Sequence, residues 1–160
     1  MGPRAPGGGG RDKVTRSKEE RVSRLNPHPF EVIEILNRRS PGTRIAVVGA
    51  SNDPAKYGNV IVRNLASKGY TILPVNPKEK EIAGLPAYPS LAAVPGPVHL
   101  VNVVTPPAVT RGVLEEAARL GLPAVWLQDG SYDDAALAVA EKAPFRTVYE
   151  ACIMVASNFG

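Results

Sequence analysis

Short apolar runs alternate with longer segments of helical periodicity between residues 44 and 149. This pattern predicts five strands over residues 45–48, 70–75, 98–104, 124–127 and 146–149, and three helices over residues 59–68, 107–120 and 132–141. The strands are almost continuously apolar, which is typical of parallel strands covered on both faces. We therefore expect a single α/β domain of the Rossmann-like, doubly wound class, with a mostly parallel sheet and helices on both faces.

Turn and cap residues agree with these boundaries. Gly69 and Gly121 stand where a left-handed residue closes a helix, and residues 131–134 resemble a capping box that would open the next helix. A short extended piece is expected at residues 87–88. Pro74 lacks the N–H donor that a central strand needs, so we expect it where its strand leaves the sheet.

The N-terminal segment differs in composition from the rest of the chain. Residues 1–24 are glycine-rich and then almost entirely polar, so we predict a disordered basic tail followed by a domain over residues 25–160. The domain would begin with a helix of about three turns that starts at Pro29. Its expected apolar stripe consists of Phe30, Val32, Ile33, Ile35 and Leu36.

Charge argues against nucleic-acid binding by the folded part. The chain has 19 basic and 15 acidic residues; residues 1–24 contain seven basic and three acidic side chains, which leaves 12 of each in residues 25–160. This balance removes the basic face that binding to a phosphate backbone requires. A solvated leader is the simpler interpretation of the tail.

Cysteine content and hydropathy favour a cytoplasmic protein. Cys152 is the single cysteine, so no intramolecular disulfide can form. No apolar run approaches the roughly 18 residues that span a bilayer, and the N-terminus lacks the apolar core of a signal peptide. We expect no membrane insertion.

The segment after the first predicted strand has the features of a phosphate-binding turn. Gly49 permits close approach of the backbone, Ser51 and Asn52 offer short polar side chains, Pro54 restricts the loop, and Gly58 keeps the helix entrance open. The N–H groups and partial positive charge of a helix N-terminus would then favour an anion. An ordinary structural β–α turn has similar features, so Gly49 alone does not decide between the two interpretations.

The end of the second strand indicates which nucleotide would bind. The second and third glycines of the dinucleotide fingerprint Gly-x-Gly-x-x-Gly are missing after Gly49. Asn76 stands where an NAD domain places an acidic residue on the ribose hydroxyls, and Pro77, Lys78 and Lys80 follow it. These residues favour a ribose that carries a phosphate, which both NADP and coenzyme A possess.

A third loop would contribute an apolar wall. Val104 and Thr105 end the third strand, and Pro106 and Pro107 open the next helix at the same edge of the sheet. The flat proline surface suits an adenine ring or a pantetheine arm, although prolines that start helices are also ordinary structure.

Several short segments together resemble the stand-alone CoA-binding domain family. That family is similar to the CoA-binding domain of the succinyl-CoA synthetase α subunit and of NDP-forming acyl-CoA synthetases. The resemblance covers residues 26–155 and is carried by residues 46–51, 75–78, 88–91, 105–107, 124–128 and 152–153. It implies a Rossmann-like domain that binds coenzyme A or an acyl-CoA.

The resemblance also implies which residues hold the cofactor. Gly49, Ala50 and Ser51 would lie near the nucleotide phosphates, and the other residues would complete the loop or form further walls of the cleft. The full set is Gly49, Ala50, Ser51, Pro54, Lys56, Tyr57, Gly58, Asn76, Pro77, Lys78, Val104, Thr105, Pro106 and Pro107.

The resemblance implies binding rather than catalysis by this chain alone. The synthetases carry their phosphorylated histidine on a second domain, and we expect His99 to be a packed or edge histidine, while His28 precedes the first helix. The implied role is a carrier, sensor or accessory module. Two alternatives remain open: a subunit of a split NDP-forming acyl-CoA ligase with a partner chain, or an NADP-binding redox sensor or reductase fragment.

The chain departs from the family near its end. Many members have an Asp-Arg-Cys-Ile run, whereas this chain has Glu150, Ala151, Cys152 and Ile153, so a role for the missing arginine does not transfer. We expect Cys152 to be a small buried residue, with a mixed disulfide to coenzyme A as the alternative. Trp126 is expected in the core. Gln128 would cap the next helix or loop, or bind a ligand amide.

Overall fold

A five-stranded parallel sheet forms the centre of the molecule, with the strand order β2-β1-β5-β6-β7. The computed structural model describes residues 29–159, so the predicted tail over residues 1–24 and His28 lie outside the described residues. The strands are β1 (Arg44–Val48), β2 (Thr71–Val75), β5 (Leu100–Val103), β6 (Ala124–Leu127) and β7 (Arg146–Tyr149). The Rossmann-like α/β class is confirmed.

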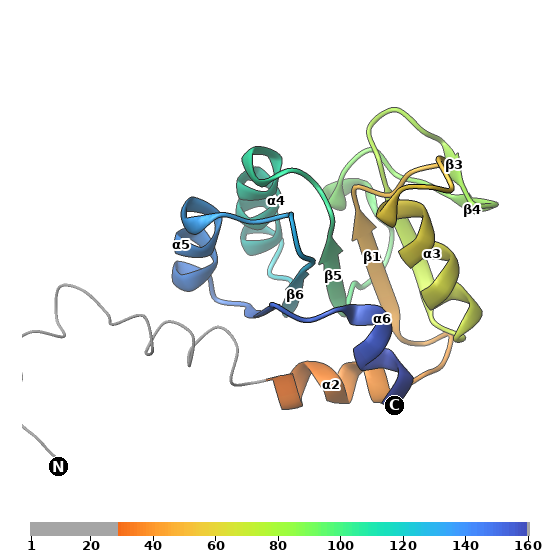
Figure 1. Ribbon diagram of the computed structural model, residues 1–160, viewed down its shortest axis with the longest axis horizontal. Helices are drawn as coiled ribbons and strands as arrows, with labels where there is room; N and C mark the ends of the chain where they lie inside the picture. The colour runs from red at the N-terminus through yellow and green to blue at the C-terminus, as the bar shows by residue number, and fades with distance from the viewer. Residues whose placement is uncertain (1–28, 160) are drawn as a thin grey trace, which may run out of the picture.

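Helices cover both faces of this sheet (Figure 1). The longer helices are α2 (Pro29–Asn37), α3 (Tyr57–Ser67), α4 (Pro107–Arg119) and α5 (Asp134–Lys142), and the chain ends with the short α6 (Ile153–Ala156) and η3 (Ser157–Phe159). Each predicted helix and strand between residues 44 and 149 is present, with ends that differ by at most two residues.

Two apolar layers hold the helices against the sheet. On one face, Leu114 of α4 and Ala136 of α5 pack with strand residues such as Val125. On the other face, α2, α3 and α6 pack around Trp126, which is 1% exposed as expected for a core residue. Removing these apolar surfaces from water supplies the main driving force for the fold.

The apolar stripe of α2 is narrower than predicted. Val32 and Leu36, one turn apart, are buried, and Ile33 and Ile35 are half-buried. Phe30 is 70% exposed, so its assignment to the stripe is wrong. At about 100° per residue, Phe30 lies roughly 160° around the helix axis from Val32, which puts it on the side facing away from the sheet.

Pro74 lies within β2, which corrects the expectation that its strand leaves the sheet there. It is opposite Val47 in the register, and β2 is an edge strand. The backbone of Thr71 bonds toward β1, and the carbonyl of Pro74 faces outward to accept from the Tyr88 N–H at 2.9 Å. An edge strand tolerates proline because the missing donor is on its outer side.

The helix ends confirm one prediction and correct another. Gly69 and Gly121 have positive φ angles of 104° and 70°, as a left-handed helix end requires. However, Asp133 caps α5, because its Oδ1 accepts from the Ala136 N–H at 2.9 Å. Ser131 instead donates to the Gln128 carbonyl, so the predicted capping box at residues 131–134 is wrong.

A small hairpin follows β2 and was not predicted. Strands β3 (Glu81–Ile82) and β4 (Leu85–Pro86) pair antiparallel and project beyond β2 (Figure 1). The short piece expected at residues 87–88 is confirmed as a one-residue parallel bridge from Tyr88 to Val75. The single turn η2 (Leu91–Ala93) then leads to β5.

Within residues 29–159, no helix has the length and apolar content to cross a membrane.

Candidate functional site at the carboxyl edge of the sheet

Gly49 follows β1 directly and lies against the ends of both neighbouring strands, β2 and β5. Its N–H donates to the Val75 carbonyl at 3.2 Å, and its φ angle of 95° is one that other residues rarely adopt. A Cβ atom at Gly49 would lie 2.9 Å from Val104 Cγ2 and 3.1 Å from the Thr105 nitrogen. The turn after β1 therefore requires glycine for both conformation and space.

Gly58 holds the start of α3 against the same turn. A Cβ atom here would lie 2.1 Å from the Gly49 carbonyl oxygen and 3.1 Å from Ala50 Cα. Both contacts are with backbone atoms, which cannot rotate away. The close approach places the first turn of α3 directly beside the end of β1.

Two asparagine side chains fix the backbone of this turn. Asn59, which is buried, donates from Nδ2 to the Ser51 carbonyl at 2.9 Å. Asn76 donates from Nδ2 to the Ala50 carbonyl at 2.8 Å and accepts from the Lys78 N–H at 2.8 Å. The Asn76 side chain thus joins the loop after β1 to the loop after β2.

The tip of the first loop is a set of local turns. Ser51 Oγ accepts from the Asp53 N–H, and Asp53 Oδ1 accepts from the Ala55 N–H, each at 3.0 Å. Pro54 and Lys56 are exposed, and Tyr57 is 52% exposed at the first position of α3. Ser51 and Asp53 stabilise the loop, and Lys56 and Tyr57 face solvent beside it.

The third loop is closed by a pair of threonines. The hydroxyls of Thr105 and Thr110 are 2.8 Å apart, and Thr110, which is fully buried, also bonds the Thr105 carbonyl at 3.2 Å. Pro106 occupies the N-cap position of α4, and Pro107 is its first residue. This arrangement positions the two prolines at the carboxyl edge.

The three loops offer backbone N–H donors and exposed ammonium groups. Neither the N-cap residue of α3, Lys56, nor that of α4, Pro106, makes a side-chain cap, in contrast to Asp133 at α5. Lys56 and Lys78 are both exposed at this edge. Such an arrangement can hold anionic groups through helix N-termini and cations. Among the described residues, no cluster of three or more acidic, histidine or cysteine side chains could hold a metal ion.

The structure brings together all three predicted loops, and it also reveals residues that sequence reasoning did not select. Asn59 and Thr110 are polar and buried, and each bonds to the backbone of one loop. Both side chains therefore fix the loop conformation at the candidate site. A buried polar residue on the apolar face of a predicted helix is the signal that could have identified them.

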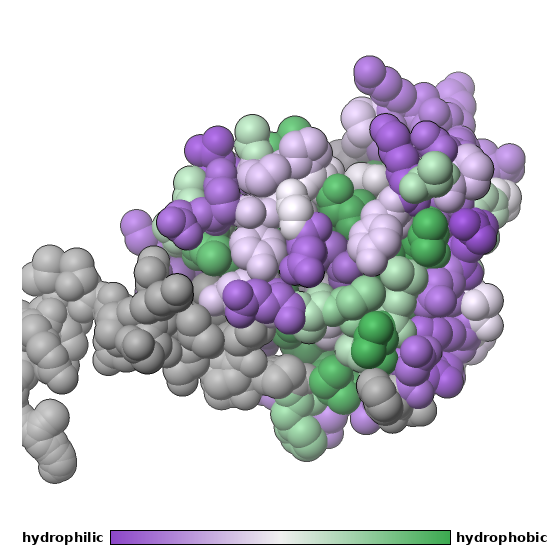
Figure 2. Space-filling view, viewed as in Figure 1, coloured by the Kyte–Doolittle hydropathy of each residue, from purple (hydrophilic) through white to green (hydrophobic). Residues whose placement is uncertain are grey.

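Asn52 has a larger role than the sequence indicated. Its Nδ2 donates to the Glu81 carbonyl at 2.8 Å and to Glu79 Oε1 at 3.2 Å, and its Oδ1 accepts from the Ala83 N–H at 3.2 Å. One side chain therefore attaches the β3–β4 hairpin to the loop after β1. The surface over this hairpin and the outer side of α3 is mostly hydrophilic (Figure 2).

Gln128 caps a helix, which was one of its two expected roles, but that helix is α6 and not the next one along the chain, α5. The side chain is 1% exposed, and its Oε1 accepts from the Ile153 N–H at 2.9 Å at the start of α6. Its Nε2 lies 3.8 Å from Cys152 Sγ. Cys152 is half-buried rather than buried, which corrects that expectation. His99 is an edge histidine as expected, because its Nδ1 accepts from the Arg44 N–H at 3.1 Å.

Two ionisable groups outside the three loops have shifted pKa values. Burial, followed by the Asp129 and Glu150 carboxylates, raises the pKa of Tyr132 above 10.0. Burial, followed by Arg39, lowers the pKa of Lys68 below 10.5. Lys68 Nζ donates to the Met154 carbonyl at 2.7 Å, which holds α6 in place. Lys68 is a structural residue and lies apart from the three loops.

A cavity of about 460 Å³ lies along β2, away from the three loops. Arg44, Thr71 and Pro95 line it at the amino end of the sheet, together with Tyr88 and other residues. It contains none of the residues predicted to hold the cofactor. The loops at the carboxyl edge and this cavity are therefore separate features.

Comparison with known proteins gives consistent matches. The model of a CoA binding domain family matches residues 43–158. "Uncharacterized protein YneT" of Bacillus subtilis is 34% identical over 131 residues, which is 82% of this chain and 95% of YneT. A hypothetical protein from Pyrococcus horikoshii OT3 superimposes with a TM-score of 0.73 at 32% identity, over 81% of this chain and 89% of the other.

A larger protein matches over a shorter region. The alpha subunit of an ADP-forming acetate–CoA ligase II from Pyrococcus furiosus is 40% identical over 82 residues. That region is 51% of this chain and 18% of the ligase subunit. The similarity thus concerns one part of the ligase subunit.

Proposed function

Because this chain belongs to the CoA-binding domain family, we propose that it binds coenzyme A or an acyl-CoA through the loops at the carboxyl edge of its sheet. The observation that carries this proposal is the contact of Gly49 with both Gly58 and Thr105. That contact brings the starts of α3 and α4 to one edge, where parallel sheets bind nucleotides.

In the proposed complex each loop has a chemical task. The backbone from Gly49 to Ser51 and the start of α3 face the phosphates, which helix N–H groups stabilise. Lys56 and Lys78 supply positive charge, and Pro106 and Pro107 provide an apolar surface for the adenine or the pantetheine arm. The proposed contact residues are Gly49, Ala50, Ser51, Pro54, Lys56, Tyr57, Gly58, Asn76, Pro77, Lys78, Val104, Thr105, Pro106 and Pro107.

We propose that the chain binds its ligand without chemistry of its own, as a cytoplasmic carrier, sensor or accessory module. His99 bonds the Arg44 backbone, and Gln128 bonds Ile153, so both side chains have structural tasks. The three loops also present backbone donors, prolines and ammonium groups. These are suited to binding an anion and a ring.

A second candidate function is that of one subunit in a split acyl-CoA ligase. The 40% identity to a ligase alpha subunit over 82 residues favours this alternative. It predicts that the chain co-purifies with a nucleotide-grasp partner chain and that acyl-CoA turnover requires both. Purification of the tagged protein from its source, followed by mass spectrometry, tests for such a partner.

Calorimetric titration of the full, ligand-stripped chain tests the main proposal. Coenzyme A is the probe, with dephospho-CoA, NADP and NAD as controls. We expect coenzyme A to bind, and its affinity to fall by about fivefold or more without the ribose phosphate, because a charge-assisted hydrogen bond is lost. Binding of NADP without binding of coenzyme A would contradict the proposal and favour the redox alternative.

A further inference from the structure

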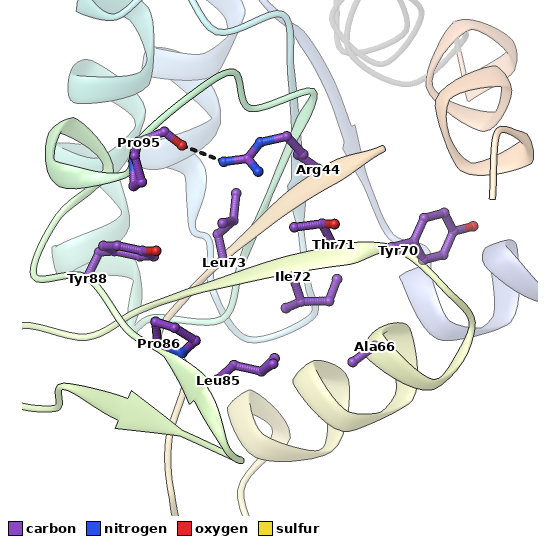
Figure 3. Close-up of a pocket in the computed structure, with 10 residues that line it drawn as sticks. All are labelled: Arg44, Ala66, Tyr70, Thr71, Ile72, Leu73, Leu85, Pro86, Tyr88 and Pro95. Atoms are coloured by element: carbon purple, nitrogen blue, oxygen red, sulfur yellow. Dashed lines mark hydrogen bonds between the residues drawn. The ribbon is translucent and has the colours of Figure 1, made fainter. Parts of the chain in front are cut away.

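A groove runs along the outer edge of β2, and the proposed cofactor site does not use it. The cavity of about 460 Å³ runs along this edge, between α3, the β3–β4 hairpin and the segment before β5. Figure 3 shows its lining residues on both sides of β2. A cavity of this volume is in the range that specific ligand sites occupy.

The backbone of Ile72 faces this groove. Along β2, Thr71 and Val75 bond toward β1, through Thr71 N–H to the Thr43 carbonyl and through the Val75 carbonyl to Gly49 N–H. Successive strand residues alternate in direction, so the N–H and C=O of Ile72 point outward like the carbonyl of Pro74. An outward N–H and C=O pair on an edge strand is a template for another strand.

The chain itself starts such a strand and then stops. Tyr88 pairs in parallel with Val75, and its N–H donates to the Pro74 carbonyl at 2.9 Å. Continuing this pairing toward Ile72 would require N–H donors from Pro86 and from Pro74, and neither proline has one. The internal strand therefore ends at Tyr88, and among the described residues no backbone hydrogen bond reaches Ile72 from the outer side of β2.

The two walls of the groove belong to opposite faces of the sheet. Ile72, Ala66 and Leu85 form an apolar wall with the α3 layer. Leu73 and Tyr88 belong to the other apolar layer and lie on the opposite side of β2 (Figure 3). Side chains of an extended peptide point alternately to the two sides, so the groove has one wall for each set.

Arg44 gives the second wall a positive charge. Its Nε donates to the Pro97 carbonyl at 2.7 Å, and its Nη2 donates to the Pro95 carbonyl (Figure 3). These neutral partners fix the guanidinium without cancelling its charge. An acidic side chain on that side of an extended peptide would complement it.

We propose that an extended segment of a partner protein adds to the outer edge of β2 and pairs with the Ile72 backbone. Its apolar side chains lie against Ala66 and Leu85, and an acidic side chain faces Arg44. The expected recognition pattern is an alternation of apolar and acidic residues. This inference is independent of the ligand at the carboxyl edge.

Synthetic peptides test the proposal with the full chain. The probe is N-acetylated, C-amidated Val-Glu-Val-Glu-Val, and the control peptides carry Gln or Lys in place of both Glu residues. Amide chemical shifts of the ¹⁵N-labelled protein report the contact. We expect the Glu peptide to shift the Ile72 and Leu73 amides, and the Lys peptide to bind about tenfold more weakly or not at all.

Methylation of peptide nitrogens tests the backbone pairing directly. The N–H groups of alternate residues in a strand point to the same edge. One peptide is methylated on the nitrogen of the central Val and another on the nitrogens of both Glu residues. We expect one peptide to lose binding and the other to keep it. Equal binding of the two peptides would overturn the proposal.

Two protein variants locate the contact. Ala66→Leu fills the apolar wall and should weaken binding of the Glu peptide by about tenfold, with coenzyme A affinity unchanged. Arg44→Gln should weaken the Glu peptide by about fivefold and leave the Gln peptide within about twofold. Circular dichroism establishes that both variants are folded.

Two further outcomes would overturn the proposal. The first is that no peptide of the set shifts the Ile72 amide at millimolar concentration. The second is that the protein dimerises in sedimentation experiments and Ala66→Leu makes it monomeric, because the edge would then pair with a second copy of this chain.

Discussion

Gly58 lies against the carbonyl oxygen of Gly49 so closely that a methyl group at residue 58 would be 2.1 Å from that oxygen. The contact joins the first turn of α3 to the end of β1 through backbone atoms alone. Neither partner can move without displacing the strand or the helix. The geometry of the candidate cofactor site therefore depends on the absence of one side chain.

Gly58→Ala should destabilise the fold and abolish coenzyme A binding. Overpacking at a rigid contact costs about 2 to 3 kcal/mol. Thermal unfolding and calorimetry measure the two effects. Gly112→Ala is the matched control, because a Cβ atom at Gly112 of α4 meets no atom within 4 Å. It should stabilise the protein by about 0.5 to 1 kcal/mol through helix propensity. A Gly58→Ala variant with unchanged coenzyme A affinity would refute the role of this contact.

Lys78→Ala should weaken coenzyme A binding by about 1 kcal/mol, which is roughly a fivefold change, if its ammonium bonds a phosphate of the ligand. The affinity for dephospho-CoA shows which phosphate is involved. Lys142→Ala, at the exposed far end of α5, controls for the change in net charge. Unchanged affinity in the Lys78 variant would assign this side chain to solvent, and Lys80 would be the next residue to replace.

Thr147→Val should raise the free energy of unfolding by about 1 kcal/mol. Among the described residues nothing bonds the buried Thr147 hydroxyl, and replacing an unsatisfied polar group with a methyl group removes its desolvation cost. Thr43→Val is the matched control, because the Thr43 hydroxyl donates to the Arg38 carbonyl. That variant should lose stability. Chemical denaturation that gives the same sign for both variants would disprove this account.

Ala83→Asn should stabilise the hairpin. Ala83 and Gly84 have φ angles of 53° and 80°, the combination found in a type I′ turn, where Asn-Gly is favoured. Relieving the strain at Ala83 should raise unfolding stability by about 0.5 to 1 kcal/mol. The Asn52 contact to the Ala83 N–H is a backbone contact and is kept. A lower melting temperature than that of the parent protein would contradict this prediction.

Stability should fall as the pH rises above 10.0, in part because of Tyr132. Burial and neighbouring carboxylates raise the pKa of Tyr132 in the folded protein above its ordinary value. The folded state therefore holds a proton that the unfolded chain releases, so alkaline conditions favour unfolding. Tyr132→Phe keeps the ring that packs edge-on against Tyr149, with centroids 5.3 Å apart. Denaturation midpoints at about pH 9 and pH 11 should differ less in this variant, and an equal difference would exclude Tyr132 as a cause.

The central sheet could be predicted because its strands are buried on both faces. Runs such as Ala124–Leu127 are continuously apolar, and Gly69 and Gly121 mark helix ends through a backbone requirement that only a few residues meet. The three candidate cofactor loops followed from the expected parallel sheet, because the carboxyl ends of parallel strands meet at one edge. Long-range contacts were not needed for these inferences.

The remaining features depend on contacts that are distant in sequence. The hairpin strands contain two residues each, which is too short for a recognisable alternation. Asn52 contacts Glu81, 29 residues away, and nothing in its local sequence selects that partner. Pro74 was misplaced because its tolerance depends on which side of β2 is the edge. Likewise, choosing Asp133 over Ser131 as the helix cap required the actual start of α5.

The Asn76 side chain, which links the Ala50 carbonyl to the Lys78 N–H, has a kinetic consequence for the proposed ligand. Because folding has already ordered these loops, binding need not wait for a slow rearrangement. Association rates for different acyl-CoA ligands should then be similar, since they share the same nucleotide. Any preference for one acyl group would appear in the time each ligand stays bound, as is usual when related ligands meet a preformed site.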